Sequence, residues 1–166
     1  MYTSRRFLFA GLLTAWLIGL SLTLHAAPLQ AFENDSLAHI IKQRQGKPFV
    51  LILWSLDCEY CQASLQALAQ KKRQNKNLNI VTLATDSMTD AQTAALIRQR
   101  LRALGMQSDT WAFGAAPAEQ LRHAIDPNWH GELPRSYWFN VGGTHGTKRA
   151  YSGVLDAAII ERYIGR

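Results

Sequence analysis

The fold is decided by one stretch of sequence, Phe49-Val-Leu-Ile-Leu-Trp54-Ser-Leu-Asp-Cys58-Glu-Tyr-Cys61. Its first six residues are all apolar, which is typical of a strand buried on both faces of a sheet. A helical pattern follows the cysteines, carries Leu65 and Leu68 on one face and ends in a lysine-rich cluster. The stretch therefore predicts a central strand over residues 49–54 that leads into a helix with Cys58 at its N-terminus.

Strand and helix patterns alternate through the rest of the chain. Helices are predicted over residues 36–45, from a Thr89/Gln92 capping box to Gly105, from Pro117 to Asp126, and over residues 156–164. Strands are predicted over residues 80–85, 111–113, 136–141 and 148–151, so that Trp111 and Trp138 fall in the core. This order predicts an α/β fold with a central mixed β-sheet flanked by helices.

Only two cysteines occur, and their C-x-x-C spacing restricts what they can do. A structural zinc site needs four ligands, and the histidines show no spacing that would complete one. A c-type haem attachment needs histidine directly after Cys61, where the sequence has Gln62. A purely stabilising disulfide is the weaker interpretation, because so short a loop removes little chain entropy. Redox exchange explains the pair best, and we expect neither a metal nor a cofactor.

The order of the two cysteines indicates their roles. Disulfide exchange requires an exposed sulfur with thiolate character and a second thiol within reach to resolve the mixed disulfide. Unpaired backbone N–H groups and the positive dipole end of a helix stabilise a thiolate at the N-terminus, which is the predicted position of Cys58. We therefore assign Cys58 as the nucleophile and Cys61 as the resolving thiol.

Composition and charge narrow the classes of partner. The 166 residues are 48% hydrophobic and 18% charged, an ordinary globular balance, and the formal net charge is +6. A nucleic-acid binder concentrates basic residues on one face among stacking aromatic residues. Here the only tight basic cluster, from Lys71 to Lys76, ends a predicted helix and complements its dipole. Nucleic acid is therefore not an expected partner.

Residues 1–27 are predicted to be a signal peptide or a membrane anchor, and residues 28–166 a single domain. Two arginines, Arg5 and Arg6, precede an almost uncharged apolar run over residues 7–24, which has the layout of an export signal. The run of 18 residues lies at the border between a long signal core and a short membrane span. In either case the domain is expected to work outside the cytoplasm.

Three segments carry a resemblance to a known family. The strand, Trp54 and the C-x-x-C pair form the first, and Gly131-Glu-Leu-Pro134, before an aromatic strand, forms the second. Tyr151-Ser-Gly-Val-Leu155, before the last helix, is the third. From about residue 30 onward the chain resembles the thioredoxin superfamily, and with its leader it is most similar to the TlpA/ResA-type exported thiol:disulfide oxidoreductases.

The resemblance implies a thioredoxin-like fold for residues 28–166 and a periplasmic protein, soluble or anchored to the inner membrane by residues 7–24. It implies a cis Leu133-Pro134 bond against the disulfide, with the backbone at Leu133 pairing with an extended substrate segment. Trp54 is expected to be a packing platform under the active-site turn. The implied partners are protein thiols or disulfides and an upstream electron donor, and we expect a monomer.

The sequence departs from the family pattern at two positions. Asp57 stands where the family commonly has an aromatic or small residue. Ile52 occupies the place of the buried acid that lies beneath the disulfide in thioredoxin. Because that acid helps to move protons during exchange, either water or another group such as Glu132 is expected to do so here.

Charges around Cys58 bear on the direction of electron flow. Asp57 and Glu59 disfavour a thiolate at Cys58, whereas the helix terminus and Arg135 are expected to favour it. This balance predicts a reductase or a mild exchange protein rather than a primary oxidant. Two alternatives stay open: a DsbA-like dithiol oxidant, and a thioredoxin-fold copper(I)-binding module or metallochaperone that holds the metal through two soft thiolates.

Overall fold

The computed structural model describes residues 28–143 and 146–165. Its strands are β1 (Gln30–Phe32), β2 (Phe49–Trp54), β3 (Ile80–Ser87), β4 (Thr110–Phe113), β5 (Arg135–Phe139) and β6 (Lys148–Ser152). Its helices are α1 (Ser36–Arg44), α2 (Glu59–Gln74), α3 (Ala91–Ala103), α4 (Ala118–Ile125) and α5 (Ala157–Ile164), with a 3-10 turn at Val141–Gly143. The alternation predicted from the sequence is confirmed.

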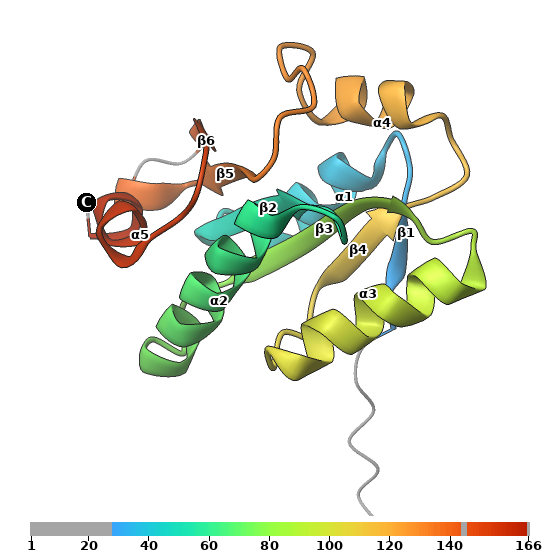
Figure 1. Ribbon diagram of the computed structural model, residues 1–166. Helices are drawn as coiled ribbons and strands as arrows, with labels where there is room; N and C mark the ends of the chain where they lie inside the picture. Colours follow the sequence, from blue (N-terminus) through green and yellow to red (C-terminus); the bar gives the residue numbers. More distant parts are fainter. Residues whose placement is uncertain (1–27, 144–145, 166) are drawn as a thin grey trace, which may run out of the picture.

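One six-stranded sheet, in the order β1-β4-β3-β2-β5-β6, organises the molecule (Figure 1). Strand β2 pairs in parallel with β3 on one side and antiparallel with β5 on the other. The two outer pairs differ in the same way, since β1 and β4 are parallel while β5 and β6 are antiparallel. The sheet is therefore mixed and β2 is interior, as the sequence predicts.

Helices cover both faces of the sheet, so β2 is buried throughout. Val50, Ile52 and Trp54 belong to a core cluster shared with α2, α3 and α5. The alternate residues of the strand belong to a second cluster, shared with α1 and α4. Burying one such side chain stabilises the fold by about 1.5 to 3 kcal/mol, as an upper estimate. This strand thereby fixes the position of the segment that follows it.

One local prediction is wrong, and one short strand was missed. Helix α3 begins at Ala91, and its N-cap is Asp90, whose carboxylate accepts a hydrogen bond from the Thr93 N–H at 2.6 Å. The Thr89 hydroxyl, expected to cap the helix, lies instead 2.8 Å from the Ser87 hydroxyl. The short edge strand β1 was not predicted, because three residues carry too little pattern.

The predicted signal peptide or membrane anchor, residues 1–27, lies outside the described residues. Within the described part of the chain, no helix is both long and apolar enough to cross a membrane.

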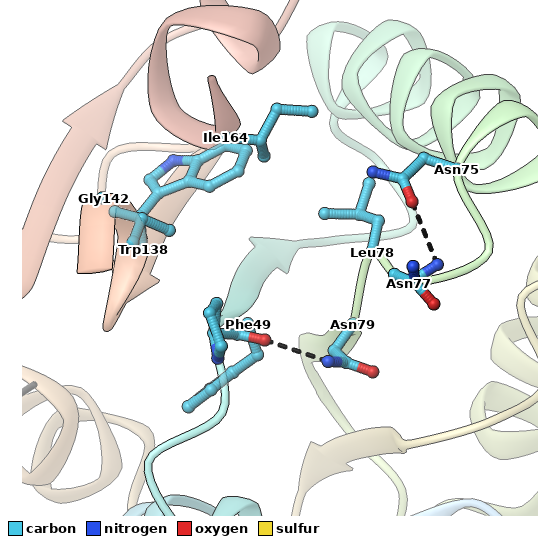
Figure 2. Close-up of a pocket in the computed structure, with 10 residues that line it drawn as sticks. Phe49, Asn75, Asn77, Leu78, Asn79, Trp138, Gly142 and Ile164 are labelled. Carbon is cyan, nitrogen blue, oxygen red and sulfur yellow. Dashed lines mark hydrogen bonds between the residues drawn. The ribbon is translucent and has the colours of Figure 1, made fainter. Parts of the chain in front are cut away.

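A cavity of about 160 Å³ opens where β2 begins, between Pro48, Phe49 and the loop that follows α2 (Figure 2). Its walls combine the indole of Trp138 with the asparagines Asn75 and Asn79. The cysteines follow the other end of β2, so the cavity and the cysteine pair lie at opposite ends of this strand.

Candidate active site

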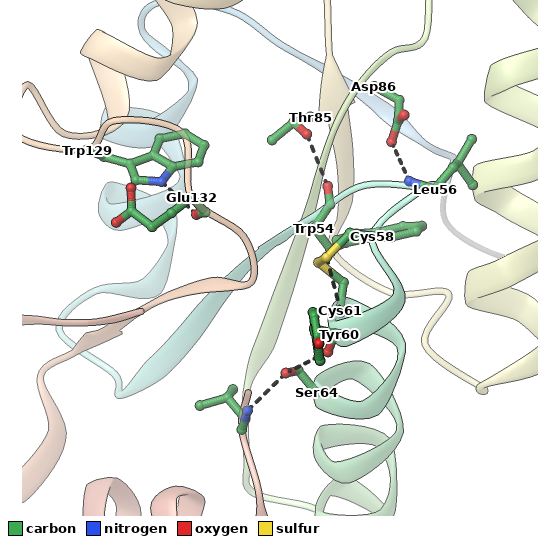
Figure 3. Close-up of a disulfide and its surroundings, with 11 residues drawn as sticks. Trp54, Leu56, Cys58, Tyr60, Cys61, Ser64, Thr85, Asp86, Trp129 and Glu132 are labelled. Carbon is green, nitrogen blue, oxygen red and sulfur yellow. Dashed lines mark hydrogen bonds between the residues drawn. A yellow bond between two sulfur atoms is a disulfide. The ribbon is translucent and has the colours of Figure 1, made fainter. Parts of the chain in front are cut away.

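The two cysteines form a disulfide at the N-terminus of α2 (Figure 3). Their Cα atoms are 5.3 Å apart, and Cys58 is the N-cap of the helix. The backbone N–H of Cys61 donates a hydrogen bond to the Cys58 sulfur at 3.1 Å. The same N–H also lies 3.1 Å from the Cys58 carbonyl oxygen, so a backbone donor in the first turn of the helix is shared between this oxygen and the sulfur assigned as nucleophile.

The two sulfurs differ in accessibility. Cys61 is fully buried in the core, whereas Cys58 is partly exposed. The residues around Cys58 on the chain, Asp57, Glu59 and Tyr60, are all exposed, and Tyr60 is exposed to 67%. An attacking group from another protein can thus reach Cys58 before Cys61.

Strand β3 holds the active-site turn in place. The Asp86 carboxylate accepts a hydrogen bond from the Leu56 N–H at 2.9 Å, and the Thr85 hydroxyl donates to the Trp54 carbonyl at 3.4 Å (Figure 3). Sequence reasoning missed Asp86. Its position at the carboxyl end of the strand next to β2 was the available signal, because parallel neighbours end at the same edge of a sheet.

Ser64 connects helix α2 to the segment just before α5. It is fully buried, and its hydroxyl accepts a hydrogen bond from the Leu155 N–H at 2.9 Å. The same hydroxyl donates to the Tyr60 carbonyl within α2, at 3.4 Å. The sequence showed only a serine on a helix, so this contact also escaped prediction.

Beneath the disulfide the structure is apolar. Trp54 is fully buried in the core cluster that contains Cys61, and so is Ile52. The partner of Ile52 on β3 is Thr82, whose buried hydroxyl has no hydrogen-bond partner among the described residues. Trp54 therefore has the surroundings of a packing platform, and no carboxylate occupies the Ile52 position.

The loop before β5 has the predicted shape. The Leu133-Pro134 peptide bond is cis, and the Pro134 carbonyl accepts a hydrogen bond from the Gly153 N–H at 3.0 Å. Leu133 is partly buried and packs against the same core cluster as Cys58. The structure thus brings the first two resembling segments to one region and ties the third, through Gly153, to the loop.

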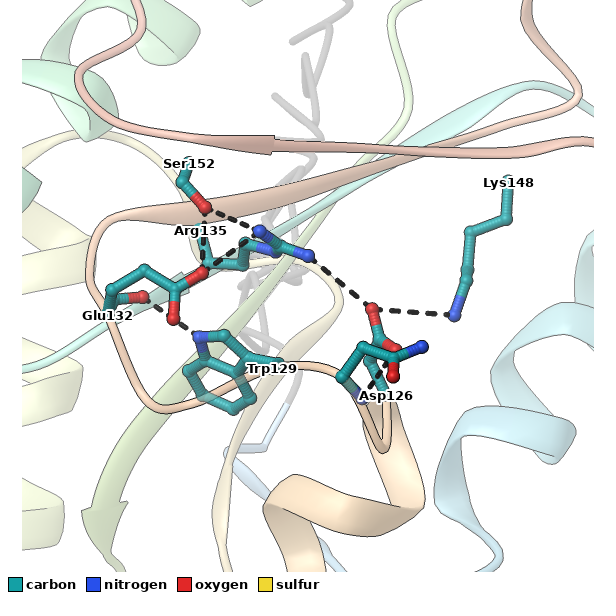
Figure 4. Close-up of polar contacts among 7 residues, drawn as sticks. Asp126, Trp129, Glu132, Arg135, Lys148 and Ser152 are labelled. Carbon is teal, nitrogen blue, oxygen red and sulfur yellow. Dashed lines mark hydrogen bonds and ion pairs between the residues drawn. The ribbon is translucent and has the colours of Figure 1, made fainter.

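An ion network fastens this loop to its surroundings (Figure 4). The Arg135 guanidinium donates to the Glu132 carboxylate at 3.0 Å and to the Ser152 hydroxyl, and lies 3.5 Å from the Asp126 carboxylate. Ser152 also donates to Glu132 at 2.8 Å. The indole N–H of Trp129 donates to the Glu132 carbonyl at 2.9 Å, which closes the loop on itself.

This network changes two expectations about charge. Burial acts to raise the pKa of Glu132, but the hydrogen bond from Ser152 and the charge of Arg135 outweigh it and hold this pKa below its ordinary value. A carboxylate held ionised is a weak base, so Glu132 is a poor candidate for moving protons near neutrality. Arg135, expected to favour the Cys58 thiolate, has its charge balanced by Glu132 and Asp126 instead.

Comparison with known proteins rests on structure alone, because no protein-family model and no curated sequence matches the chain. A secreted disulfide oxidoreductase of Mycobacterium tuberculosis, described as homologous to E. coli DsbE, aligns with a TM-score of 0.55 at 17% identity. The alignment covers 75% of this chain and 84% of that one.

Two further solved structures align with the chain to a similar extent. DsbF of M. tuberculosis aligns with a TM-score of 0.57 at 16% identity, over 75% of this chain and 83% of that one. A thioredoxin-related protein of Neisseria meningitidis gives a TM-score of 0.55 at 18% identity, over 72% and 84% of the two chains. The chain therefore has a thioredoxin-like fold, which it shares with these three proteins.

Proposed function

We propose that this protein is an exported thiol:disulfide oxidoreductase that reduces or exchanges disulfides of other proteins through Cys58 and Cys61. The observation that carries the proposal is the disulfide itself, with one partly exposed sulfur at a helix N-terminus and one buried sulfur behind it. A purely structural bridge has no need of this asymmetry.

The proposed reaction proceeds through two exchanges. In the reduced protein the Cys58 thiolate attacks one sulfur of a client disulfide, which forms a mixed disulfide and releases the other client sulfur as a thiolate. The Cys61 thiolate then attacks the Cys58 sulfur and releases the second client thiol. The client gains two electrons and two protons, and the protein is left with the Cys58–Cys61 disulfide. A dithiol donor outside the chain must restore the reduced form.

Helix α2 supports the first exchange. The N–H of Cys61 that lies 3.1 Å from the Cys58 sulfur can donate to a thiolate there, and the positive end of the helix dipole acts in the same direction. Both effects come from the backbone, so they require no charged side chain next to the cysteines.

The charges near Cys58 support reduction over oxidation. Asp57 and Glu59 flank the sulfur with exposed carboxylates, and the Arg135 guanidinium pairs with other groups. A strongly oxidising protein depends on a stabilised thiolate in its reduced form. We therefore expect a reduction potential closer to that of thioredoxin, about −270 mV, than to that of DsbA, about −120 mV. Equilibration with glutathione buffers measures it, and a value near that of DsbA would reverse the direction.

Export is the remaining part of the proposal. The apolar run over residues 7–24, behind Arg5 and Arg6, supports it, and one of the similar structures is described as secreted. Expression of the full chain with a C-terminal tag, followed by fractionation, distinguishes a cleaved signal peptide from an anchor by mass.

The decisive experiment is trapping with a Cys61→Ala variant of the full chain. Without the resolving thiol, the mixed disulfide between Cys58 and its client cannot be released, so adducts accumulate and identify the client. Cys58→Ala is the matched control, since its remaining thiol is buried and should trap nothing. A folded Cys61→Ala protein without adducts would contradict the proposed function.

A further inference from the structure

A groove beside the active-site turn is left unused by the reaction above. It has a volume of about 390 Å³ and separates the turn from helix α3. We call it the α3 groove, and define it by its lining residues, Leu56, Asp57, Leu96, Gln99, Arg100 and Ala103. Asp57 directly precedes Cys58, so the groove begins one residue from the reacting sulfur.

Part of the α3 groove is apolar and open. Leu96 is 46% exposed, which makes it one of few large apolar side chains on the described surface. Leu56 lines the opposite wall, and its side chain points away from the disulfide toward α3 (Figure 3). The hydrogen bond from its N–H to Asp86 fixes this wall. A partner side chain placed between the walls would remove both leucines from water.

The helical wall is basic and unpaired. Helix α3 contains Arg98, Arg100 and Arg102 but no acidic residue. Among residues 28–143 and 146–165, no carboxylate lies within ion-pair distance of any of these three arginines. Of the three, only Arg100 lines the α3 groove. Arg98 and Arg102 line a separate cavity with Pro28 and Leu29.

We propose that the α3 groove binds an extended segment of the client polypeptide, with an apolar side chain over Leu96 and an acidic side chain paired with Arg100. This inference rests on the proposed function and adds to it a preference for clients with an apolar and an acidic residue near the reactive cysteine. The groove starts at Asp57 and an extended chain advances about 3.3 Å per residue, so spacings of about three to six residues from the client cysteine sample about 10 to 20 Å along the groove.

The test uses synthetic peptides with one intramolecular disulfide, a leucine in the flanking segment, and Glu, Gln or Lys placed in turn three to six residues from the reactive cysteine. The measured quantity is the second-order rate of their reduction by the reduced full chain. At one or more positions, we expect the Glu peptide to react about fivefold faster than the Lys peptide, and the ratio to fall in 1 M salt.

Charge reversal gives the sharpest comparison. Arg100→Glu should invert the ratio of Glu to Lys peptide rates, while Arg98→Glu, the same change on the same helix outside the α3 groove, should leave the preference for Glu in place. Leu96→Ser should slow every leucine peptide, whereas Ile41→Ser, at a residue that is 39% exposed on α1, should not. Equal ratios in wild type and Arg100→Glu at every position would overturn the inference.

Failure of this inference can be told apart from failure of the proposed function. Hydroxyethyl disulfide is uncharged and has no acidic or apolar side chain that could occupy the α3 groove. If the wild-type protein reduces this compound but shows no charge preference among the peptides, only the α3 groove assignment is wrong. If it reduces neither, the proposed function fails first.

Discussion

The active-site turn, residues 55–61, and the cis-proline loop, residues 129–135, are held in place in different ways. In the turn, the two sulfurs are held by a disulfide between residues three apart and by an N–H from the same helical turn, while Asp86 on β3 holds Leu56. The loop depends on a network of charged side chains, because Arg135 pairs with Glu132 within the loop and with Asp126 after α4, and also donates to the Ser152 hydroxyl on β6. The reacting sulfurs are therefore joined by contacts within one helical turn, while the loop beside them depends on paired charges.

This difference predicts where mutations act. Changes in the turn should alter redox chemistry with little effect on stability, and changes in the loop network should alter stability first.

Arg135→Gln should destabilise the protein most. The Arg135 and Asp126 side chains are only 14% and 10% exposed, so removing the guanidinium leaves a nearly buried carboxylate with only the longer ion pair to Lys148, at 3.9 Å. We expect a loss of about 2 kcal/mol in the free energy of unfolding, measured in urea, with partial recovery in Arg135→Lys. A loss below about 0.5 kcal/mol would show that the loop does not need its network.

Ser64→Ala should have the next largest effect. The substitution removes the acceptor of the buried Leu155 N–H and should cost about 1 to 2 kcal/mol, again measured in urea. Gln66→Ala, on an exposed position of the same helix, is the control and should change little. Equal effects of the two substitutions would show that the hydrogen bond between Ser64 and Leu155 does not stabilise the fold.

The network should also give the protein an acid-sensitive component of stability. Burial acts to raise the pKa of Asp126, but the Asn128 N–H and the cations Lys148 and Arg135 outweigh it and lower this pKa below its ordinary value. Because the unfolded chain then binds protons more readily, this stability is present near neutral pH and is lost as the pH falls through the folded pKa. Thermal melts between pH 6 and pH 2 should show a shallower decline for Asp126→Asn, and parallel curves would contradict this.

The smallest effect is expected outside the network. Glu119 pairs with Arg122 at 3.7 Å, but its side chain is 89% exposed. Glu119→Gln should change the free energy of unfolding by less than about 0.5 kcal/mol. A change as large as that of Arg135→Gln would mean that burial does not explain the contrast between the two kinds of ion pair.

Features with a strong local pattern could be predicted from the sequence. The apolar run of β2, the position of Cys58 at a helix N-terminus and the alternation of elements follow from residue spacing. The cis bond before Pro134 was predicted instead from the resemblance to a known family.

Features that join distant segments could not be predicted. Asp86 bonds to a backbone group 30 residues away, and its only signal was its position at the carboxyl end of the strand next to β2. Ser64 bonds to a backbone group 91 residues away, and no pattern along the chain marks that contact. The partners of Arg135 could not be predicted either. The sequence led us to expect this charge near Cys58, but it gave no sign of the ion pair with Asp126. The prediction of Thr89 as the N-cap of α3 failed for a smaller reason, since the adjacent Asp90 also has a side chain that caps helices well.

The central claim is that Cys58 and Cys61 form a reversible redox pair in which Cys58 reacts first. Its most direct test is timed alkylation of the folded protein after reduction with dithiothreitol, read by peptide mass spectrometry. We expect complete reduction without unfolding, followed by modification of Cys58 well ahead of Cys61. A disulfide that resists excess dithiothreitol in the folded protein, or faster modification of Cys61, would contradict the account.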